Sequence, residues 1–283
     1  MIQEIEPHIF DNSFCMKKAS ENDKVLIYLK NKVLLKKENN KIYFPEFYQI
    51  EEYIGDIYEK AEYCFSVDMV GYYLYRNLEI KEFEGFKFYD IKILRESKPK
   101  ENAFIAITGS QIYRWKENRK FCGKCGGEME NSICERALIC KKCGQIEYPK
   151  ISPAIIVAII NKDKLLVTRY ANRSYTAYAL VAGFVEIGET FEETVKREVM
   201  EEVGLRVKNI TYYKSQPWAF SDSQMIGFFA ELDGNDKITL DENELSEGKW
   251  IKFEEIQEAE NEASIGQELM KVIKNGEYKK YLK

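Results

Sequence analysis

The chain has 283 residues, of which 45 % are hydrophobic, so it is long enough for about two globular domains with cores of their own. The formal net charge of −5 argues against a general nucleic-acid-binding protein. The cysteine count of 7 is odd, which argues against a disulfide framework, so a reducing, cytoplasmic location is expected.

No part of the sequence is expected to enter a membrane. The longest apolar run, residues 154–160, is far too short to cross a bilayer. Residues 1–6 are acidic and lack the apolar core of a signal peptide.

Residues 1–95 are predicted to form a small mixed or mainly β domain. Their apolar runs are short and separated by polar residues, and the predicted strands are 25–29, 32–35, 64–67 and 71–75. The chain has a single histidine, His8, which excludes a Ser-His-Asp or Cys-His mechanism at any other position.

Residues 96–148 are predicted to hold a helix followed by a metal site. A polar linker, 96–102, precedes a helical pattern over 103–120, in which Gly109 is a local weak point. Two C-x-x-C pairs then follow, fourteen residues apart: Cys122, Cys125, Cys140 and Cys143. Four thiolates at this spacing suit one tetrahedral Zn²⁺ with no position left for water, so the ion is expected to be structural, one per chain.

Two alternatives to this zinc site are unliganded thiols and a redox dithiol, and two matched pairs are explained more simply by one ion. The nearby basic residues form a local patch. They favour a solvated surface or compensation of the negative zinc–thiolate charge over binding of an RNA backbone. They are Arg119, Lys120, Lys124, Lys141 and Lys142.

Residues 149–283 are predicted to form an α/β/α sandwich. The continuous apolar run 154–160 is expected to be a strand buried on both faces. Further strands are predicted at 165–168, 210–214, 226–232 and 250–251, with a short helix at 253–257 and an amphipathic helix at 265–274.

The most informative stretch of this domain is residues 183–205. A glycine-containing loop leads into a helix that Thr190 can cap and that Gly204 can end. At 100° per residue three glutamates fall within a wedge of roughly 100°. They are Glu198, Glu201 and Glu202. Carboxylates clustered on one rigid helix suit Mg²⁺ or Mn²⁺.

The spacing in this stretch resembles the signature of Nudix hydrolases, G-x5-E-x7-R-E-U-x-E-E-x-G-U, where U is aliphatic. The matching residues are Gly183, Glu189, Arg197, Glu198, Val199, Glu201, Glu202, Gly204 and Leu205. The cysteine pairs ahead of it, and residues 215–223 after it, resemble the NADH pyrophosphatase family, whose pattern there is S-Q-P-W-P-F-P-x-S. Ala219 and Ser221 replace two prolines of that pattern, which should loosen the substrate loop.

The resemblance implies metal-dependent hydrolysis of the pyrophosphate of NADH or NAD⁺, giving nicotinamide mononucleotide and AMP, and extends to removal of an NAD cap from RNA. It implies that Glu198, Glu201 and Glu202 are catalytic and bind Mg²⁺ or Mn²⁺. Glu244 and the carbonyl of Ala182 are implied as further metal ligands, and in the sequence alone Glu242 and Glu247 are rivals to Glu244. Glu201 is the first choice for the base or an additional ligand.

The resemblance also implies a set of substrate-binding residues and a homodimer. The substrate set is Tyr148, Phe184, Gln216, Pro217, Trp218, Phe220, Ser223 and Gly266. Alternative functions are hydrolysis of ADP-ribose or diadenosine polyphosphates, or a nucleotide-sensing or RNA-binding module without catalysis. The full set of glutamates argues against the last alternative.

Overall fold

The computed structural model describes residues 1–76, 80–171, 177–257 and 263–282. It divides into two compact units, Ile2–Lys150 and Ile151–Lys283, the second of which also includes Met1. Within the described residues no helix has the length and apolar character needed to cross a bilayer. The domain borders predicted at residues 95 and 148 stay predictions.

A mixed sheet and one long helix form the body of the first unit. The strand order is β1-β5-β6-β2-β3-β4, with β7 paired to β3. The strands are β1 Phe10–Asp11, β2 Lys24–Leu29, β3 Lys32–Glu38, β4 Lys41–Tyr43, β5 Glu62–Val67, β6 Val70–Tyr75 and β7 Phe86–Asp90. The helices are α1 Phe47–Ile50, α2 Ile57–Lys60, the 3-10 turn η1 Ile91–Arg95 and α3 Lys100–Asn118. The four strands predicted from apolar runs in this unit are confirmed.

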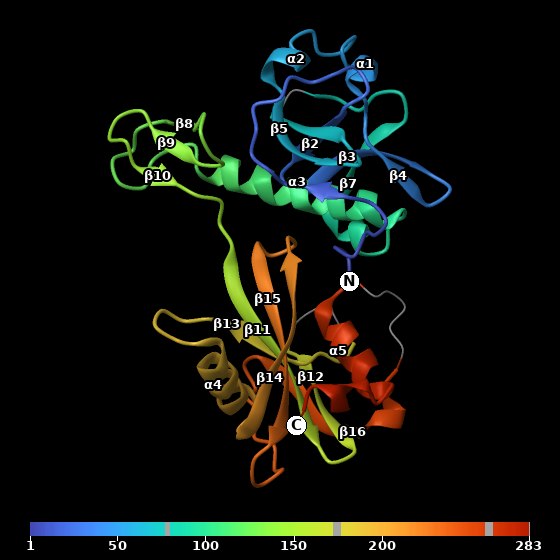
Figure 1. Ribbon diagram of the computed structural model, residues 1–283, viewed down its shortest axis with the longest axis vertical. Helices are drawn as coiled ribbons and strands as arrows, with labels where there is room; N and C mark the ends of the chain where they lie inside the picture. The colour runs from blue at the N-terminus through green and yellow to red at the C-terminus, as the bar shows by residue number, and fades with distance from the viewer. Residues whose placement is uncertain (77–79, 172–176, 258–262, 283) are drawn as a thin grey trace. The chain divides into compact units, whose positions relative to one another are not determined.

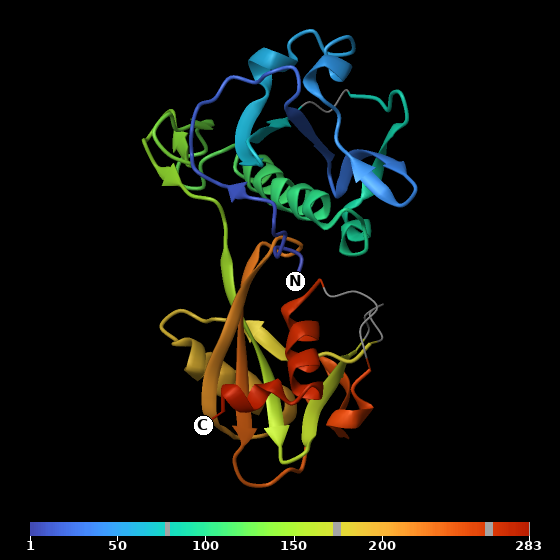
Figure 2. The same cartoon turned by 45° about the vertical axis from the view of Figure 1, so that its right-hand side comes forward.

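Helix α3 packs against β2 of this sheet (Figure 2). The Tyr28 hydroxyl donates a hydrogen bond to the carbonyl of Ala106 at 2.7 Å. Gly109 makes the close approach possible, because a Cβ there would lie 2.5 Å from side-chain atoms of both Leu26 and Tyr28. The apparent weak point of the helix is therefore a packing requirement.

A three-stranded antiparallel sheet follows α3 in the same unit. Its order is β10-β9-β8, with β8 Met129–Asn131, β9 Leu138–Cys140 and β10 Ile146–Glu147.

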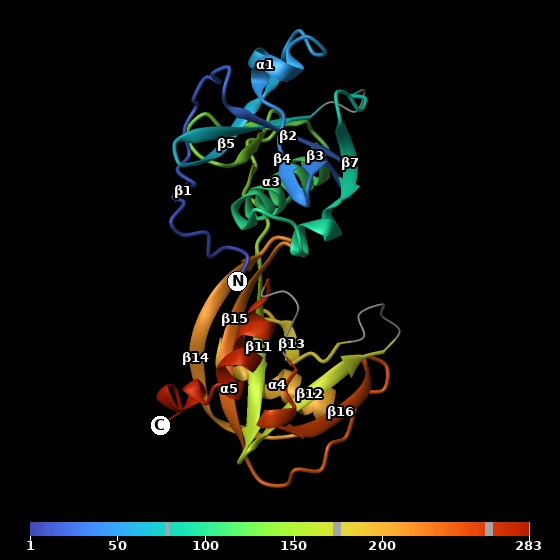
Figure 3. The same ribbon diagram turned by 90° about the vertical axis from the view of Figure 1, so that its right-hand side faces the viewer.

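The second unit is a mixed sheet with helices on opposite faces, α4 on one and α5 on the other (Figures 1 and 3). The order is β14-β15-β11-β12-β16, with β13 paired to β11, and β11 runs parallel to β15. The strands are β11 Ser152–Asn161, β12 Lys164–Tyr170, β13 Val181–Phe184, β14 Val207–Trp218, β15 Ser223–Leu232 and β16 Leu245–Lys252. The helices are α4 Phe191–Val203, α5 Ile265–Lys274 and the 3-10 turns η2 Phe253–Glu255 and η3 Glu277–Lys280.

This arrangement confirms the predicted α/β/α sandwich. Strand β11 lies at its centre and contributes side chains to the cores on both faces of the sheet. Alternate residues of β11 pack into different cores: Ile155 and Val157 face α4, whereas Ala158 and Ile160 face α5. A strand buried on both faces needs an unbroken apolar sequence.

Residues 215–223, which resemble the NADH pyrophosphatase pattern, are mostly strand and not the loop that was expected from the sequence. Residues 215–218 are the end of β14 and pair with 223–226 of β15, so that the turn itself is only 219–222. Ala219, in place of a proline, is buried in this turn. Ala219 and Ser221, which replace the two prolines, both lie in this turn, and the predicted loosening stays a prediction.

Candidate active site and zinc centre

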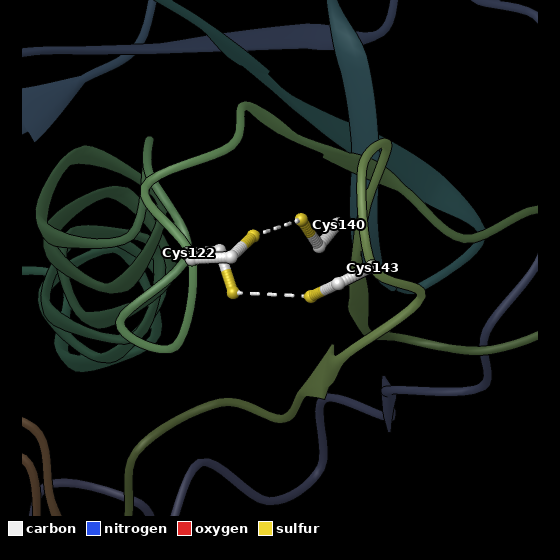
Figure 4. Close-up of side chains that lie close together, drawn as sticks. Cys122, Cys140 and Cys143 are labelled. Atoms are coloured by element: carbon white, nitrogen blue, oxygen red, sulfur yellow. Dashed lines mark hydrogen bonds between the residues drawn. The ribbon is translucent and has the colours of Figure 1, made fainter.

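The four predicted cysteines converge at one point. Their Sγ atoms all lie within 4.8 Å of one another. The Cys122–Cys143 and Cys125–Cys140 sulfur pairs are 3.8 and 3.5 Å apart, and the labelled thiols point toward a common centre (Figure 4). Tetrahedral zinc with Zn–S bonds of about 2.3 Å requires sulfurs about 3.8 Å apart, so this group fits one Zn²⁺.

Matching turns build the two halves of this centre. The N–H of Gly126 donates to the carbonyl of Cys122, and the N–H of Gly144 donates to that of Cys140, each at 2.9 Å. Both glycines have φ near +70°, which favours glycine over any residue with a Cβ. Each C-x-x-C-G segment thus forms the same tight loop.

The charge balance at the sulfurs also calls for a cation. Backbone N–H donors, first that of Cys143, lower the pKa of Cys140 to about 6. At Cys125 the N–H of Gly127 has the same effect, but hydrogen bonding with the other thiols outweighs it and raises the pKa to about 12. Four thiolates this close together would repel one another, and a cation bound between them would remove that repulsion.

The glutamate-bearing helix α4 begins and ends where the sequence indicates. Thr190 accepts a hydrogen bond from the N–H of Glu193, whose carboxylate accepts one from the N–H of Thr190. Gly204 ends the helix in the left-handed conformation. The fully buried stripe Val195, Val199 and Val203 fixes the face that α4 turns to the sheet.

Arg197 fastens the preceding loop to α4. Its Nε donates to Glu189 at 2.6 Å, and its Nη2 donates to the same carboxylate and to the carbonyl of Phe184, both at 3.0 Å. These hydrogen bonds lower the pKa of Glu189 to about 2. Arg197 and Glu189 thus form an ion pair between the helix and the loop. Buried Thr194 also donates to Glu189 at 2.8 Å, a contact that was not predicted from the sequence.

The glutamates of α4 differ in exposure. Glu202 is buried, the side chain of Glu198 is only 13 % exposed, and that of Glu201 is 59 % exposed. The carboxylate of Glu198 lies against Gly183, where a Cβ would occupy the same space. Only glycine at 183 therefore leaves room for this carboxylate.

The charge of Glu244 also acts on the carboxylate of Glu198. Burial raises the pKa of Glu198, and the charges of Glu201 and Glu244 raise it further, against the opposing effect of Arg197. A carboxylate with a raised pKa among like charges gains most from a cation. Glu244 sits in the turn before β16, and its carbonyl accepts from the N–H of Ala171 at 2.8 Å.

The predicted convergence of these glutamates is only partial. Among the described residues, the cysteine centre alone brings three or more potential ligand atoms within 4.8 Å of one another. The Nη1 of Arg197 instead holds Glu198 at 2.8 Å and Glu201 at 2.9 Å. Like charges separate and share the guanidinium. The donors are nonetheless the oxygen ligands that Mg²⁺ and Mn²⁺ take, so Glu198, Glu201, Glu202 and Glu244 fit such an ion.

The predicted substrate residues occupy different settings. On β13, Phe184 is exposed beside half-buried Ala182, and Pro217 is exposed at the end of β14. Rings of Trp218 and Phe220 are 4.8 Å apart across the turn. In the first unit, Tyr148 is exposed and donates to Glu135 at 3.1 Å.

The other three predicted substrate residues, Gln216, Ser223 and Gly266, contact neighbouring residues of the chain. Gln216 is fully buried and bonds the backbone at Ala263 and Ile265. Buried Ser223 lies 3.0 Å from the hydroxyl of Ser221. Gly266 lies at the start of α5, where a Cβ would meet Ile156 at 3.0 Å. Their contacts with substrate stay predictions.

Both the glutamate-bearing domain and the cysteine centre match known protein families. Residues 150–272 match the NUDIX domain, and residues 117–148 match the NADH pyrophosphatase zinc ribbon domain. With its glutamate helix, cysteine centre and sandwich fold, the chain belongs to the Nudix hydrolase family.

Individual relatives are more specific. The chain is 37 % identical over 201 residues to the NAD-capped RNA hydrolase NudC of Salmonella heidelberg, covering 68 % of this chain and 77 % of that protein. It is 41 % identical over 163 residues to the NudC protein of Haemophilus influenzae, covering 56 % of this chain and 61 % of that protein. A crystal structure of a Nudix hydrolase from Nitrosomonas europaea aligns at 25 % identity with a TM-score of 0.49, over 56 % of this chain and 93 % of the other.

Proposed function

We propose that this chain hydrolyses the pyrophosphate bond of NADH or NAD⁺ to nicotinamide mononucleotide and AMP, and that it removes an NAD cap from RNA. One observation carries the proposal: Glu198 is held against Gly183 within the field of Glu201 and Glu244. The zinc ribbon and the names of the NudC relatives support a dinucleotide as the substrate.

The residues divide the work as follows. Glu198, Glu201, Glu202 and Glu244, with the Ala182 carbonyl, would hold Mg²⁺ or Mn²⁺, which neutralises the pyrophosphate and supplies an activated water. Glu201 is the most exposed of the three signature glutamates Glu198, Glu201 and Glu202, and we propose that it takes a proton from water. Arg197 holds the loop and orients Glu198 and Glu201.

The nucleotide is proposed to bind among the residues implied by the family pattern. Phe184, Trp218 and Phe220 offer exposed or half-buried rings for a base or for nicotinamide. Gln216 acts through the segment 263–265 that it holds, which presents Gly266. Tyr148, Pro217 and Ser223 complete the proposed set. A homodimer and a cytoplasmic location are part of the proposal.

Product analysis tests this function. The protein is incubated with NADH, ADP-ribose, diadenosine tetraphosphate or NAD-capped RNA, with Mg²⁺ or Mn²⁺, and the products are separated by chromatography. Reduced nicotinamide mononucleotide plus AMP supports the proposal, and Glu201→Gln should lower that turnover by about 10²-fold or more. Hydrolysis of ADP-ribose or the diadenosine compound alone supports another Nudix specificity. No product from any substrate supports a non-catalytic module.

A further inference from the structure

Two cationic side chains, one from strand β12 and one from strand β16, lie against the ring of a single tyrosine. The guanidinium carbon of Arg169 lies 4.3 Å from the ring centre of Tyr178, and the ammonium of Lys249 lies 4.8 Å from it. Both cations also contact Glu247, each at 3.1 Å. We call Arg169, Tyr178, Glu247 and Lys249 the cationic platform; with two positive groups and one carboxylate its net charge is +1.

Strand register explains why these side chains meet. Arg169 is opposite Glu247, and Val167 is opposite Lys249, so that the three charged residues extend the sheet face to which Val167 and Ile251 belong. Thr168 and Ala179 exchange two backbone hydrogen bonds of 2.9 Å, which bring Tyr178 beside Arg169. The position is therefore fixed by backbone pairing.

The Arg169 guanidinium of the platform has an N–H donor available to a ligand. Among the described residues no acceptor lies within hydrogen-bonding distance of Arg169 Nε, although that atom is buried from solvent. A buried, unpaired charged donor is costly unless an acceptor reaches it. About two-fifths of the Arg169 and Lys249 side chains is exposed, so a ligand can reach them.

The platform lies on the same face of the sheet as Gly266, which is proposed to contact the nucleotide. Tyr178 packs on the same apolar cluster as Ile156, against which Gly266 sits. Two residues beyond Arg169, the N–H of Ala171 bonds the carbonyl of the proposed metal ligand Glu244. Both neighbours belong to the proposed site.

We propose that Arg169 and Lys249, held over the ring of Tyr178, bind a phosphate that the substrate carries in addition to its pyrophosphate. This inference rests on the proposed function. A guanidinium fork and an ammonium on an aromatic face are a suitable pair of phosphate donors. Such a phosphate is carried on the adenosine ribose, either as the 2′-phosphate of NADPH or as the 3′-phosphodiester of NAD-capped RNA.

The test measures kcat/KM for three substrates: NADH, NADPH and an NAD-capped dinucleotide that has one added phosphodiester. Arg169→Gln and Lys249→Gln should each lose about tenfold on at least one phosphate-bearing substrate and less than about twofold on NADH. A lower kcat/KM for NADPH would identify the 2′-phosphate as the bound group, and a lower kcat/KM for the capped dinucleotide would identify the 3′-phosphodiester. Increasing salt should weaken the same reaction selectively.

A control variant separates recognition from folding. Lys164→Gln removes a lysine from the exposed far end of β12 and should leave all three reactions unchanged. An equal loss on NADH and the phosphate-bearing substrates, or no loss on either, would overturn the inference.

Failure of the proposed function gives a different result. If wild-type protein hydrolyses none of these substrates, the proposed function is wrong, and calorimetric binding of NAD⁺, NADP⁺ and the NAD-capped dinucleotide decides the inference. The platform then predicts that Arg169→Gln weakens binding of NADP⁺ or of the capped dinucleotide by about tenfold and leaves NAD⁺ binding unchanged. Unchanged binding of all three ligands by the variant would contradict it.

Discussion

The side chain of Gln216 connects strand β14 to the start of helix α5 through Ile265. Its Oε1 accepts a hydrogen bond from the N–H of Ile265 at 2.7 Å, and its Nε2 donates to the carbonyl of Ala263 at 2.8 Å. The first N–H groups of a helix have no partner within the helix, so this amide satisfies one of them in a fully buried place. The segment that presents Gly266 is thereby fixed.

Replacing this amide should therefore affect stability and binding together. Gln216→Leu leaves two backbone groups unsatisfied and should lower the free energy of unfolding by about 2–4 kcal/mol. Because Gly266 is then less firmly held, the KM for NADH should rise. Chemical denaturation and steady-state kinetics check both, with half-buried Gln224→Leu as the control. Unchanged stability in Gln216→Leu would show that the amide holds nothing in place.

The contact between Gly183 and Glu198 gives a second prediction. Gly183→Ala puts a Cβ in the space of the Glu198 carboxylate, so the carboxylate must move. Misplacement of a reacting group by about 1 Å can cost 10²-fold in rate, so kcat should fall by about that factor. Gly55→Ala is the matched control, since a Cβ there meets nothing within 4 Å. Wild-type kcat in Gly183→Ala would exclude Glu198 from the chemistry.

The Arg197–Glu189 pair predicts a pH-dependent contribution to stability. The folded pKa of Glu189 is lowered to about 2 from an ordinary value of 4.5. The pair's contribution is therefore complete above about pH 4.5 and is lost as the pH falls toward 2. Glu189→Gln should unfold more easily than the wild type at pH 7, and the difference should shrink below pH 4.5. Urea unfolding across this range tests it; a difference independent of pH would contradict the assignment.

The cysteine centre predicts that zinc and folding are linked. Cys140→Ser removes one of four ligands and should lower the zinc content per chain and the melting temperature. Exposed Cys134→Ser lies outside the group and should change neither. Metal analysis and thermal unfolding suffice for both variants. Full zinc content with an unchanged melting temperature in Cys140→Ser would refute the structural role.

Local signals in the sequence were enough to predict the helix of the glutamates and the cysteine centre. Thr190 and Gly204 act through the backbone next to them, and the four cysteines sit in tight turns of two short segments. The burial of β11 on both faces was likewise visible in its apolar run. These features depend on residues close together in the chain.

Features that depend on distant pairing were not predictable. From the sequence, Gln216 was predicted to bind the substrate. Its buried hydrogen bonds to residues 263 and 265 form only because the start of α5 lies against β14 in the folded chain. The Arg169–Tyr178 contact depends on the backbone pairing of Thr168 with Ala179. The hold of Arg197 on both Glu198 and Glu201 depends on side-chain conformations that no spacing specifies.

Binding of Mn²⁺ to the glutamate site tests the central claim most directly. Electron paramagnetic resonance of the zinc-loaded protein counts bound Mn²⁺ in the wild type, in Glu198→Gln and in the control Glu128→Gln on the zinc ribbon. Saturable binding should be lost in Glu198→Gln and kept in the control, with zinc content unchanged in all three. Equal Mn²⁺ binding by the wild type and Glu198→Gln would contradict the assignment of these glutamates as the metal-binding catalytic centre.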